Sequence, residues 1–175
     1  MRPALHVIGG SWPGRLATMA HPRGGSWLQA EMTGLAEMGV DVLVSALTCD
    51  ENQRMGLTGI AGAAAAAGVE FLSFPIADRG VPPEFDLADG LRAPEENVVA
   101  LGVRLAAHVR AGRFVVTQCF AGIGRSTLLA GVTLVMLGVG PEEALALMSK
   151  ARGLPVPDTE AQRTWLYEFA ATHGA

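Results

Sequence analysis

Residues 115–127 read Val-Val-Thr-Gln-Cys-Phe-Ala-Gly-Ile-Gly-Arg-Ser-Thr and hold the strongest signals for fold and chemistry in the sequence. The β-branched and aromatic residues at 114–117 predict a buried strand. The apolar segment 126–137 has helix-compatible spacing and predicts a helix packed against a sheet. The loop between them carries Cys119 and Arg125, and it presents backbone N–H groups at a helix N-terminus, which favours a bound anion.

Each residue type in this loop suits the binding of a phosphate group and its attack by sulfur. Gly122 and Gly124 are predicted to adopt positive φ and to let a ligand approach the backbone. The guanidinium of Arg125 offers a two-pronged donor set that matches phosphate oxygens. A helix N-terminus and a guanidinium both favour the thiolate form of a cysteine, so Cys119 is the predicted nucleophile. Ser126 is predicted to donate a hydrogen bond to this sulfur and to ease its departure from a phosphocysteine.

The segment CFAGIGRS, from Cys119 to Ser126, resembles the Cys-x5-Arg-Ser/Thr signature of the cysteine-dependent protein phosphatases. Its inner Gly-x-Gly is most similar to the tyrosine and dual-specificity group. The family usually has a histidine before the cysteine, where this chain has the uncharged Gln118. The resemblance implies that the loop N–H groups and the arginine hold the phosphoryl oxygens, which assigns substrate binding to Phe120, Ala121, Gly122, Ile123, Gly124 and Arg125.

Cleavage of a phosphate ester also needs a proton donor for the leaving oxygen, and then a base for the attacking water. Asp78 lies in the segment FPIADRGVP, residues 74–82, directly after a predicted strand, where loops of a parallel sheet gather around ligands. The segment resembles the general-acid loop of dual-specificity-like phosphatases, which implies that Asp78 is the acid. The alternative is that Asp78 only initiates a turn. Asp86 and Asp89 are rival carboxylates that the resemblance does not match to the acid position.

Cys49 follows the predicted buried strand 41–47. Because neighbouring parallel strands end at the same edge of a sheet, Cys49 is a candidate neighbour of Cys119. Some phosphatases of the resembled group carry a second cysteine at a similar place, which implies a redox partner that captures the oxidised nucleophile as a disulfide. The alternative is that Cys49 is a small buried hydrophobic residue.

Length and composition favour a compact protein and argue against some classes of partner. The chain has 175 residues, half of them hydrophobic, so we expect a single domain over residues 1–175. The net charge of −4 and the absence of a Lys/Arg run argue against a nucleic-acid partner. No apolar stretch reaches the length of a membrane span, and two distant cysteines make no disulfide framework, so we expect a cytoplasmic protein. The four histidines lack metal-ligand spacing, and no metal or other cofactor is expected.

The alternation of strands and helices predicts an α/β fold in which helices flank a mostly parallel central sheet, as in dual-specificity phosphatases. Ser26 is a predicted cap for a helix that runs to about Met38. Asp158 or Thr159 is the predicted cap of the last helix, where Gln162 is expected to assist capping and to fix the C-terminal segment. The alternative, suggested by a comparable stretch in related phosphatases, is that Arg152 or Gln162 approaches the phosphate pocket. Strand, Asp loop, long helix, phosphate loop and closing helices come in the order of the resembled family.

These features predict a cysteine-dependent phosphatase that hydrolyses phosphate monoesters through a phosphocysteine intermediate. The expected substrate is phosphotyrosine or phosphoserine/threonine in a protein, or a small phosphorylated molecule. Phe120, Ala121 and Ile123 bring no lysine to the loop, which argues against a highly charged inositol phosphate. The alternative, suggested by Gln118, is a phosphate-recognising module with little or no turnover. A rhodanese-like sulfur transferase or an arsenate reductase fits the glycine pattern and the upstream Asp loop less well.

Overall fold

The computed structural model describes residues 2–83 and 97–174, and its centre is one five-stranded sheet. The strand order is β1-β2-β5-β3-β4. Neighbours among β2, β5, β3 and β4 pair in parallel, and β1 runs antiparallel to β2 at one edge. The strands are β1 (His6–Val7), β2 (Arg15–Ala20), β3 (Val42–Ser45), β4 (Glu70–Ser73) and β5 (Phe114–Cys119). The predicted mostly parallel sheet is confirmed.

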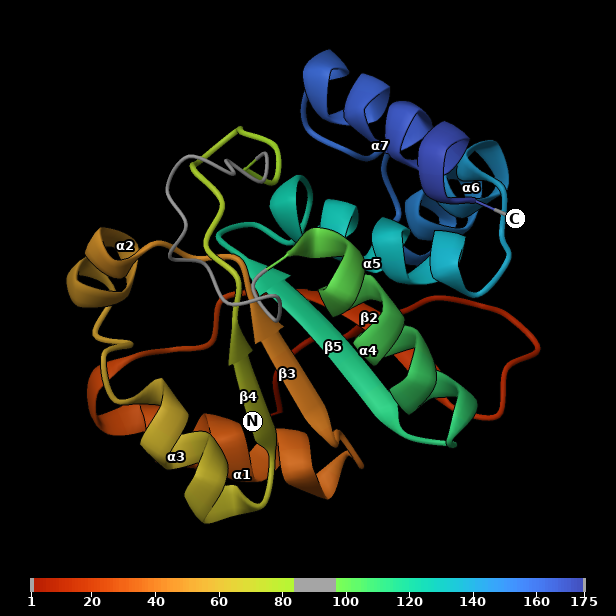
Figure 1. The fold of residues 1–175 in the computed structure, drawn as a ribbon. Helices are drawn as coiled ribbons and strands as arrows, with labels where there is room; N and C mark the ends of the chain where they lie inside the picture. Colours follow the sequence, from red (N-terminus) through yellow and green to blue (C-terminus); the bar gives the residue numbers. More distant parts are fainter. Residues whose placement is uncertain (1, 84–96, 175) are drawn as a thin grey trace.

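Helices cover both faces of the sheet and give the molecule three layers (Figure 1). One face is covered by α1 (Leu28–Glu37) and α3 (Ile60–Ala67). The other face is covered by α4 (Val98–Arg110), α5 (Arg125–Met136), α6 (Pro141–Arg152) and α7 (Glu160–His173). A buried hydrophobic cluster fills each interface, and α5 is buried around nearly its whole circumference because α4, α6 and α7 all pack on it. The predicted α/β fold with flanking helices is therefore confirmed.

The central strand β5 positions the phosphate loop. All six of its residues are buried, as expected for a β-branched and aromatic run between two parallel neighbours. Its register pairs Cys119 with Ala20 of β2, and Gln118 with Ser45 of β3. The carboxyl ends of three parallel strands therefore meet around Cys119, the edge at which α/β sheets bind ligands. The short helix α2 (Cys49–Arg54) lies at the same edge (Figure 1).

The predicted start of the first helix differs from the structure. Ser26 does not cap α1, which begins at Leu28 after a 3₁₀ turn over Gly25–Trp27 that has no side-chain cap. Gly25 has φ +60° and donates its N–H to the carbonyl of Gly56 at 2.9 Å. This hydrogen bond to the segment after α2 fixes the direction in which the chain enters α1.

At the last helix, Thr159 caps α7 through a capping box with Gln162, as predicted for one of the two candidates.

Across the residues that the structure describes, no helix combines the length and the apolar character needed to cross a bilayer.

Candidate active site

The thiol of Cys119 lies in a cavity of about 220 Å³ at the carboxyl edge of the sheet. The residue is 2% exposed. Three segments far apart in the sequence form the walls: the phosphate loop, the turn after β4, and the N-terminus of α7. Their lining residues are Cys119, Phe120, Ala121, Ile123, Gly124 and Arg125 from the loop, Asp78 and Arg79 from the turn, Asp158 just before the N-cap of α7, and Gln162 in its first turn. The structure thus brings together the predicted nucleophile, arginine and carboxylate.

Ser126 lies directly beside the sulfur, as predicted. The thiol of Cys119 donates to Ser126 Oγ at 3.2 Å, and both side chains are buried. When the sulfur is a thiolate, the direction of this bond reverses and the hydroxyl donates to it. Thr117 fixes the start of α5 from the strand side, because its hydroxyl donates to the carbonyl of Ser126 at 2.8 Å.

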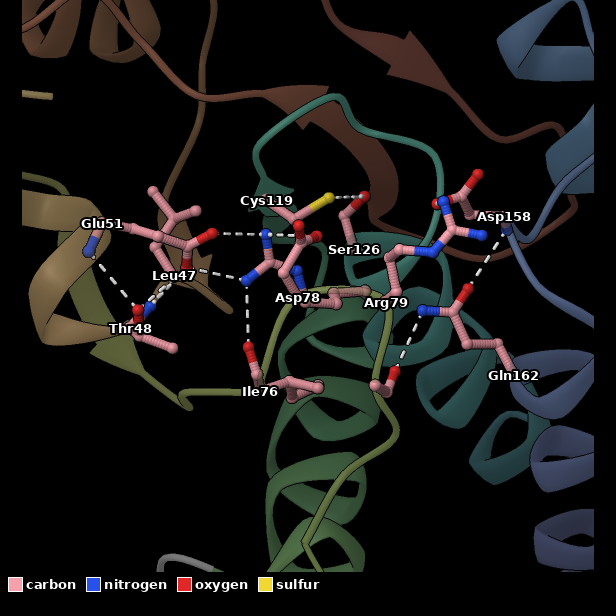
Figure 2. Close-up of polar contacts among 12 residues, drawn as sticks. Leu47, Thr48, Glu51, Ile76, Asp78, Arg79, Cys119, Ser126, Asp158 and Gln162 are labelled. Carbon is pink, nitrogen blue, oxygen red and sulfur yellow. Dashed lines mark hydrogen bonds and ion pairs between the residues drawn. The ribbon is translucent and has the colours of Figure 1, made fainter. Parts of the chain in front are cut away.

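Arg125 is held from behind by a buried ion pair with Glu51 of α2. Its Nη1 and Nη2 donate to the two carboxylate oxygens of Glu51, both at 2.8 Å, and Nη1 also donates to the carbonyl of Ile76 at 2.9 Å (Figure 2). A guanidinium has five N–H donors, and these contacts use both on Nη1 and one on Nη2. The edge formed by Nε and Nη2 is the part of Arg125 left for an anion, and its two parallel donors match the two-pronged geometry predicted for phosphate.

The same contacts shift the ionisation of both partners. Hydrogen bonds from Arg125 lower the pKa of Glu51 from its ordinary 4.5 to about 2, against the opposing effect of burial. Burial alone would lower the pKa of Arg125, but the hydrogen bonds and charge of Glu51 outweigh it and raise that pKa. Both groups are therefore charged at neutral pH, and the cavity has a fixed cation at its base.

Asp78 occupies the turn after β4 and reaches the same cavity. Its Oδ1 lies 3.4 Å from Arg125 Nη2, and its side chain is 74% exposed. Arg125, the predicted phosphate ligand, thus lies against both the predicted acid and Glu51. Asp86 and Asp89, the rival carboxylates, fall outside the described residues.

Gly122 and Gly124 are required for different reasons. The predicted positive φ is confirmed at Gly122 and wrong at Gly124. Gly122 has φ +71°, and a β-carbon there would lie 2.8 Å from the backbone of β2. Gly124 has φ −97°, not the predicted positive value. The reason for a glycine at this position is tertiary, because a β-carbon would lie 3.0 Å from the amide of Gln162.

Gln118, which stands where the resembled family usually has a histidine, points away from the cavity. Successive strand residues face opposite sides of a sheet, and Cys119 belongs to the cluster under α4 to α7, whereas Phe114 and Val116 belong to the cluster under α1 and α3. Gln118 shares the face of Phe114 and Val116. Its amide is fully buried, and within the described part of the chain neither its oxygen nor its nitrogen has a hydrogen-bond partner.

Cys49 does not line the Cys119 cavity. It is exposed at the first turn of α2 and borders a separate pocket with Phe71 of β4 and Ile60 of α3. Both cysteines are free thiols. The alternative of a buried hydrophobic residue is therefore wrong for Cys49, while its disulfide with Cys119 stays a prediction.

Comparisons with known proteins bear on the fold. No protein-family model and no curated protein matches the sequence. Kinase-associated phosphatase, in a form with its catalytic cysteine replaced by serine, is 19% identical over 98% of this chain and 96% of that chain, with a TM-score of 0.80. This is the fold of the cysteine-dependent phosphatases.

Two further solved structures share this phosphatase fold. Tk-PTP in its active form is 24% identical over 97% of both chains, with a TM-score of 0.68. PTPMT1 in complex with PI(5)P is 23% identical over 90% of both chains, with a TM-score of 0.66. The predicted resemblance to dual-specificity and tyrosine phosphatases is thereby confirmed at the level of the phosphatase fold.

Sequence reasoning missed Glu51, assigned Asp158 to helix capping alone, and gave the approach of Gln162 to the pocket only as an alternative to capping. Glu51 closes a capping box with Thr48, so the pattern Thr-x-x-Glu explains it locally. A stronger signal was the arginine itself, because a guanidinium buried beneath a phosphate site needs a carboxylate partner. Nothing local indicates which carboxylate that is, since Glu51 and Arg125 are 74 residues apart.

Proposed function

We propose that the protein is a cysteine-dependent phosphatase that hydrolyses phosphate monoesters through a phosphocysteine intermediate. One observation carries this proposal: Cys119, Arg125 and Asp78 line a single cavity. They supply a sulfur nucleophile, a fixed cation for the phosphoryl oxygens and a carboxyl group for the leaving oxygen. The phosphatase fold supports the same assignment.

In the first step, the thiolate of Cys119 attacks phosphorus and an S–P bond forms. The bond from phosphorus to the ester oxygen breaks, and protonated Asp78 gives its proton to that oxygen, which leaves as an alcohol or phenol. The N–H groups of the loop and the Nε–Nη2 edge of Arg125 hold the three remaining phosphoryl oxygens.

In the second step, water attacks the phosphocysteine and Asp78, now a carboxylate, accepts a proton from it. The S–P bond breaks and phosphate is released. Ser126 donates a hydrogen bond to the departing thiolate, from the position 3.2 Å away that the structure shows, and keeps its own proton. The first step leaves Asp78 ionised and the second protonates it again, so the cycle closes without another reactant.

We further propose that the substrate is a phosphorylated side chain of a protein, tyrosine or serine/threonine. A second cavity of about 180 Å³ adjoins the first and shares Asp78 and Phe120 with it. Arg54 and Met55 line this second cavity, and Phe120 is 55% exposed at the boundary. A residue next to the phosphorylated one has room there, in contact with apolar surface.

Replacing Cys119 by serine tests the proposed mechanism. Cys119→Ser is expected to abolish hydrolysis of 4-nitrophenyl phosphate while affinity for inorganic phosphate is kept. Wild type should show a burst of nitrophenol and inhibition by vanadate. Hydrolysis that persists in Cys119→Ser would refute the nucleophile. Phosphate binding without any vanadate-sensitive hydrolysis by wild type would favour the binding module instead.

A further inference from the structure

The turn that carries Asp78 has an unusual backbone. It spans Ala77 to Gly80 and is closed by the Gly80 N–H, which donates to the carbonyl of Ala77 at 2.8 Å. Arg79 has φ +60°, and among the residues that the structure describes it is the one non-glycine residue in the left-handed region. Side chains with a β-carbon avoid this region, so surrounding contacts must hold Arg79 there.

Those contacts come from the N-terminus of α7 (Figure 2). Gln162 is fully buried, and its Nε2 donates to the carbonyl of Gly80 at 2.9 Å. Its Oε1 accepts from the backbone N–H groups of Asp158 and Thr159 at 3.2 and 3.1 Å, so its amide joins the turn to α7. Beside this joint, Arg79 Nη1 lies 3.9 Å from Asp158 Oδ2.

The charges of this pair matter because both side chains line the phosphate cavity. The carboxylate of Asp158 is a negative charge at a site that must accept a phosphate dianion, and an unscreened carboxylate there would repel the substrate. The guanidinium of Arg79 offsets this charge. At the same time, its pairing with Asp158 ties the residue that directly follows Asp78 to a rigid helix end.

We propose that Arg79 and Asp158 form a positioning pair that holds the turn of Asp78 over the phosphate site and neutralises Asp158 toward the bound phosphate. The first role rests on the proposed function and acts through Asp78, while the second concerns anion binding alone. Their side chains are 67% and 44% exposed, and exposed ion pairs are weak, so each role should change the measured quantity about two- to five-fold.

The first role is tested by the dependence of hydrolysis on the leaving group. The assay compares kcat/KM for phenyl phosphate, a poor leaving group that relies on the acid, with kcat/KM for 4-nitrophenyl phosphate. The preference is the ratio of kcat/KM for 4-nitrophenyl phosphate to kcat/KM for phenyl phosphate. We expect Arg79→Gly and Asp158→Asn each to raise this ratio about two- to five-fold, and the double variant to raise it no further. Glycine accepts positive φ, so Arg79→Gly removes the charge without backbone strain. Arg79→Asn, which also tolerates this conformation, should match it.

The second role is tested by binding of inorganic phosphate, measured by calorimetry on the same variants, and it needs no turnover. Arg79→Gly should weaken binding about two- to five-fold, and adding Asp158→Asn should restore it. An unchanged substrate preference in both single variants, or single effects that multiply in the double variant, would overturn the positioning role. Phosphate affinity that stays weak in the double variant would overturn the neutralising role. If wild type lacks turnover, the proposed function fails, and the phosphate measurement still decides the pair.

Discussion

Neutralising Glu51 tests whether the buried ion pair beneath the phosphate site stabilises the fold. Arg125 and Glu51 have side chains only 2% and 9% exposed. The substitution Glu51→Gln keeps the shape and one acceptor oxygen, but it removes the buried counter-charge of the guanidinium and leaves the exposed carboxylate of Asp78 beside it. The pKa of Glu51 is lowered from 4.5 to about 2 by Arg125. At about 1.4 kcal/mol per tenfold change in protonation, ionised Glu51 contributes about 3 kcal/mol to the free energy of unfolding.

The pH dependence follows from the sign of this shift. The folded-state pKa lies below the unfolded value, so the stabilisation is fully present above about pH 5 and is lost as the pH falls toward 2. Glu51→Gln lacks this contribution at every pH. The difference in unfolding free energy between wild type and Glu51→Gln should therefore be about 3 kcal/mol near pH 7 and less than half of that near pH 3.

Urea denaturation followed by tryptophan fluorescence measures this difference, since the chain has three tryptophans. The control is Glu168→Gln, which removes the charge of an exposed carboxylate on α7 and should change stability by no more than about 0.5 kcal/mol. Apart from Glu51 and Glu168, the two variants have the same titrating carboxylates, so the remaining groups contribute equally to the pH dependence of both. A difference that is the same at both pH values, or one no larger than that of the control, would refute the reasoning. Because the guanidinium loses its anchor, kcat/KM of folded Glu51→Gln should also fall, by about 10- to 100-fold.

Three other substitutions probe the loop and its strand, and a fourth serves as the control for the first. Gly122→Ala should abolish hydrolysis, since its β-carbon would lie 2.8 Å from the β2 backbone. The control is Gly112→Ala, because Gly112 also has positive φ but a β-carbon there would meet no atom within 4 Å. Gly112→Ala should cost only about 1 kcal/mol of stability and leave activity unchanged. Equal losses of activity in Gly122→Ala and Gly112→Ala would contradict this prediction. Ser126→Ala should slow breakdown of the phosphocysteine more than its formation. In stopped flow, the burst of nitrophenol should be retained while the steady-state rate of hydrolysis falls. Loss of the burst with an unchanged steady-state rate would argue against this role. Gln118→Met replaces a buried amide, for which the described residues offer no hydrogen-bond partner, by an apolar side chain. It should raise the free energy of unfolding by about 1 kcal/mol, whereas a lower melting temperature would show that the amide is satisfied.

Much of the site could be predicted because its signals are local. The change from strand to helix around Cys119 and Arg125 follows from the pattern of apolar residues, and six of the ten residues that line the cavity lie in that one loop. Asp78 could be predicted because loops after parallel strands converge on the same edge of the sheet. The failure at Ser26 has the opposite cause: a backbone contact with Gly56, 31 positions from Gly25, sets the entry to α1.

The sequence by itself determined the type of fold and the chemistry of the loop, because periodicity, loop glycines and the Cys-x5-Arg spacing act over a few residues. Only the tertiary structure decided which groups hold that chemistry in place. Glu51 meets Arg125 across 74 residues, and Gln162 meets Gly80 across 82. Such pairs depend on how helices dock at the end of the sheet, and a buried charge or amide takes whichever partner the docking brings within hydrogen-bond distance.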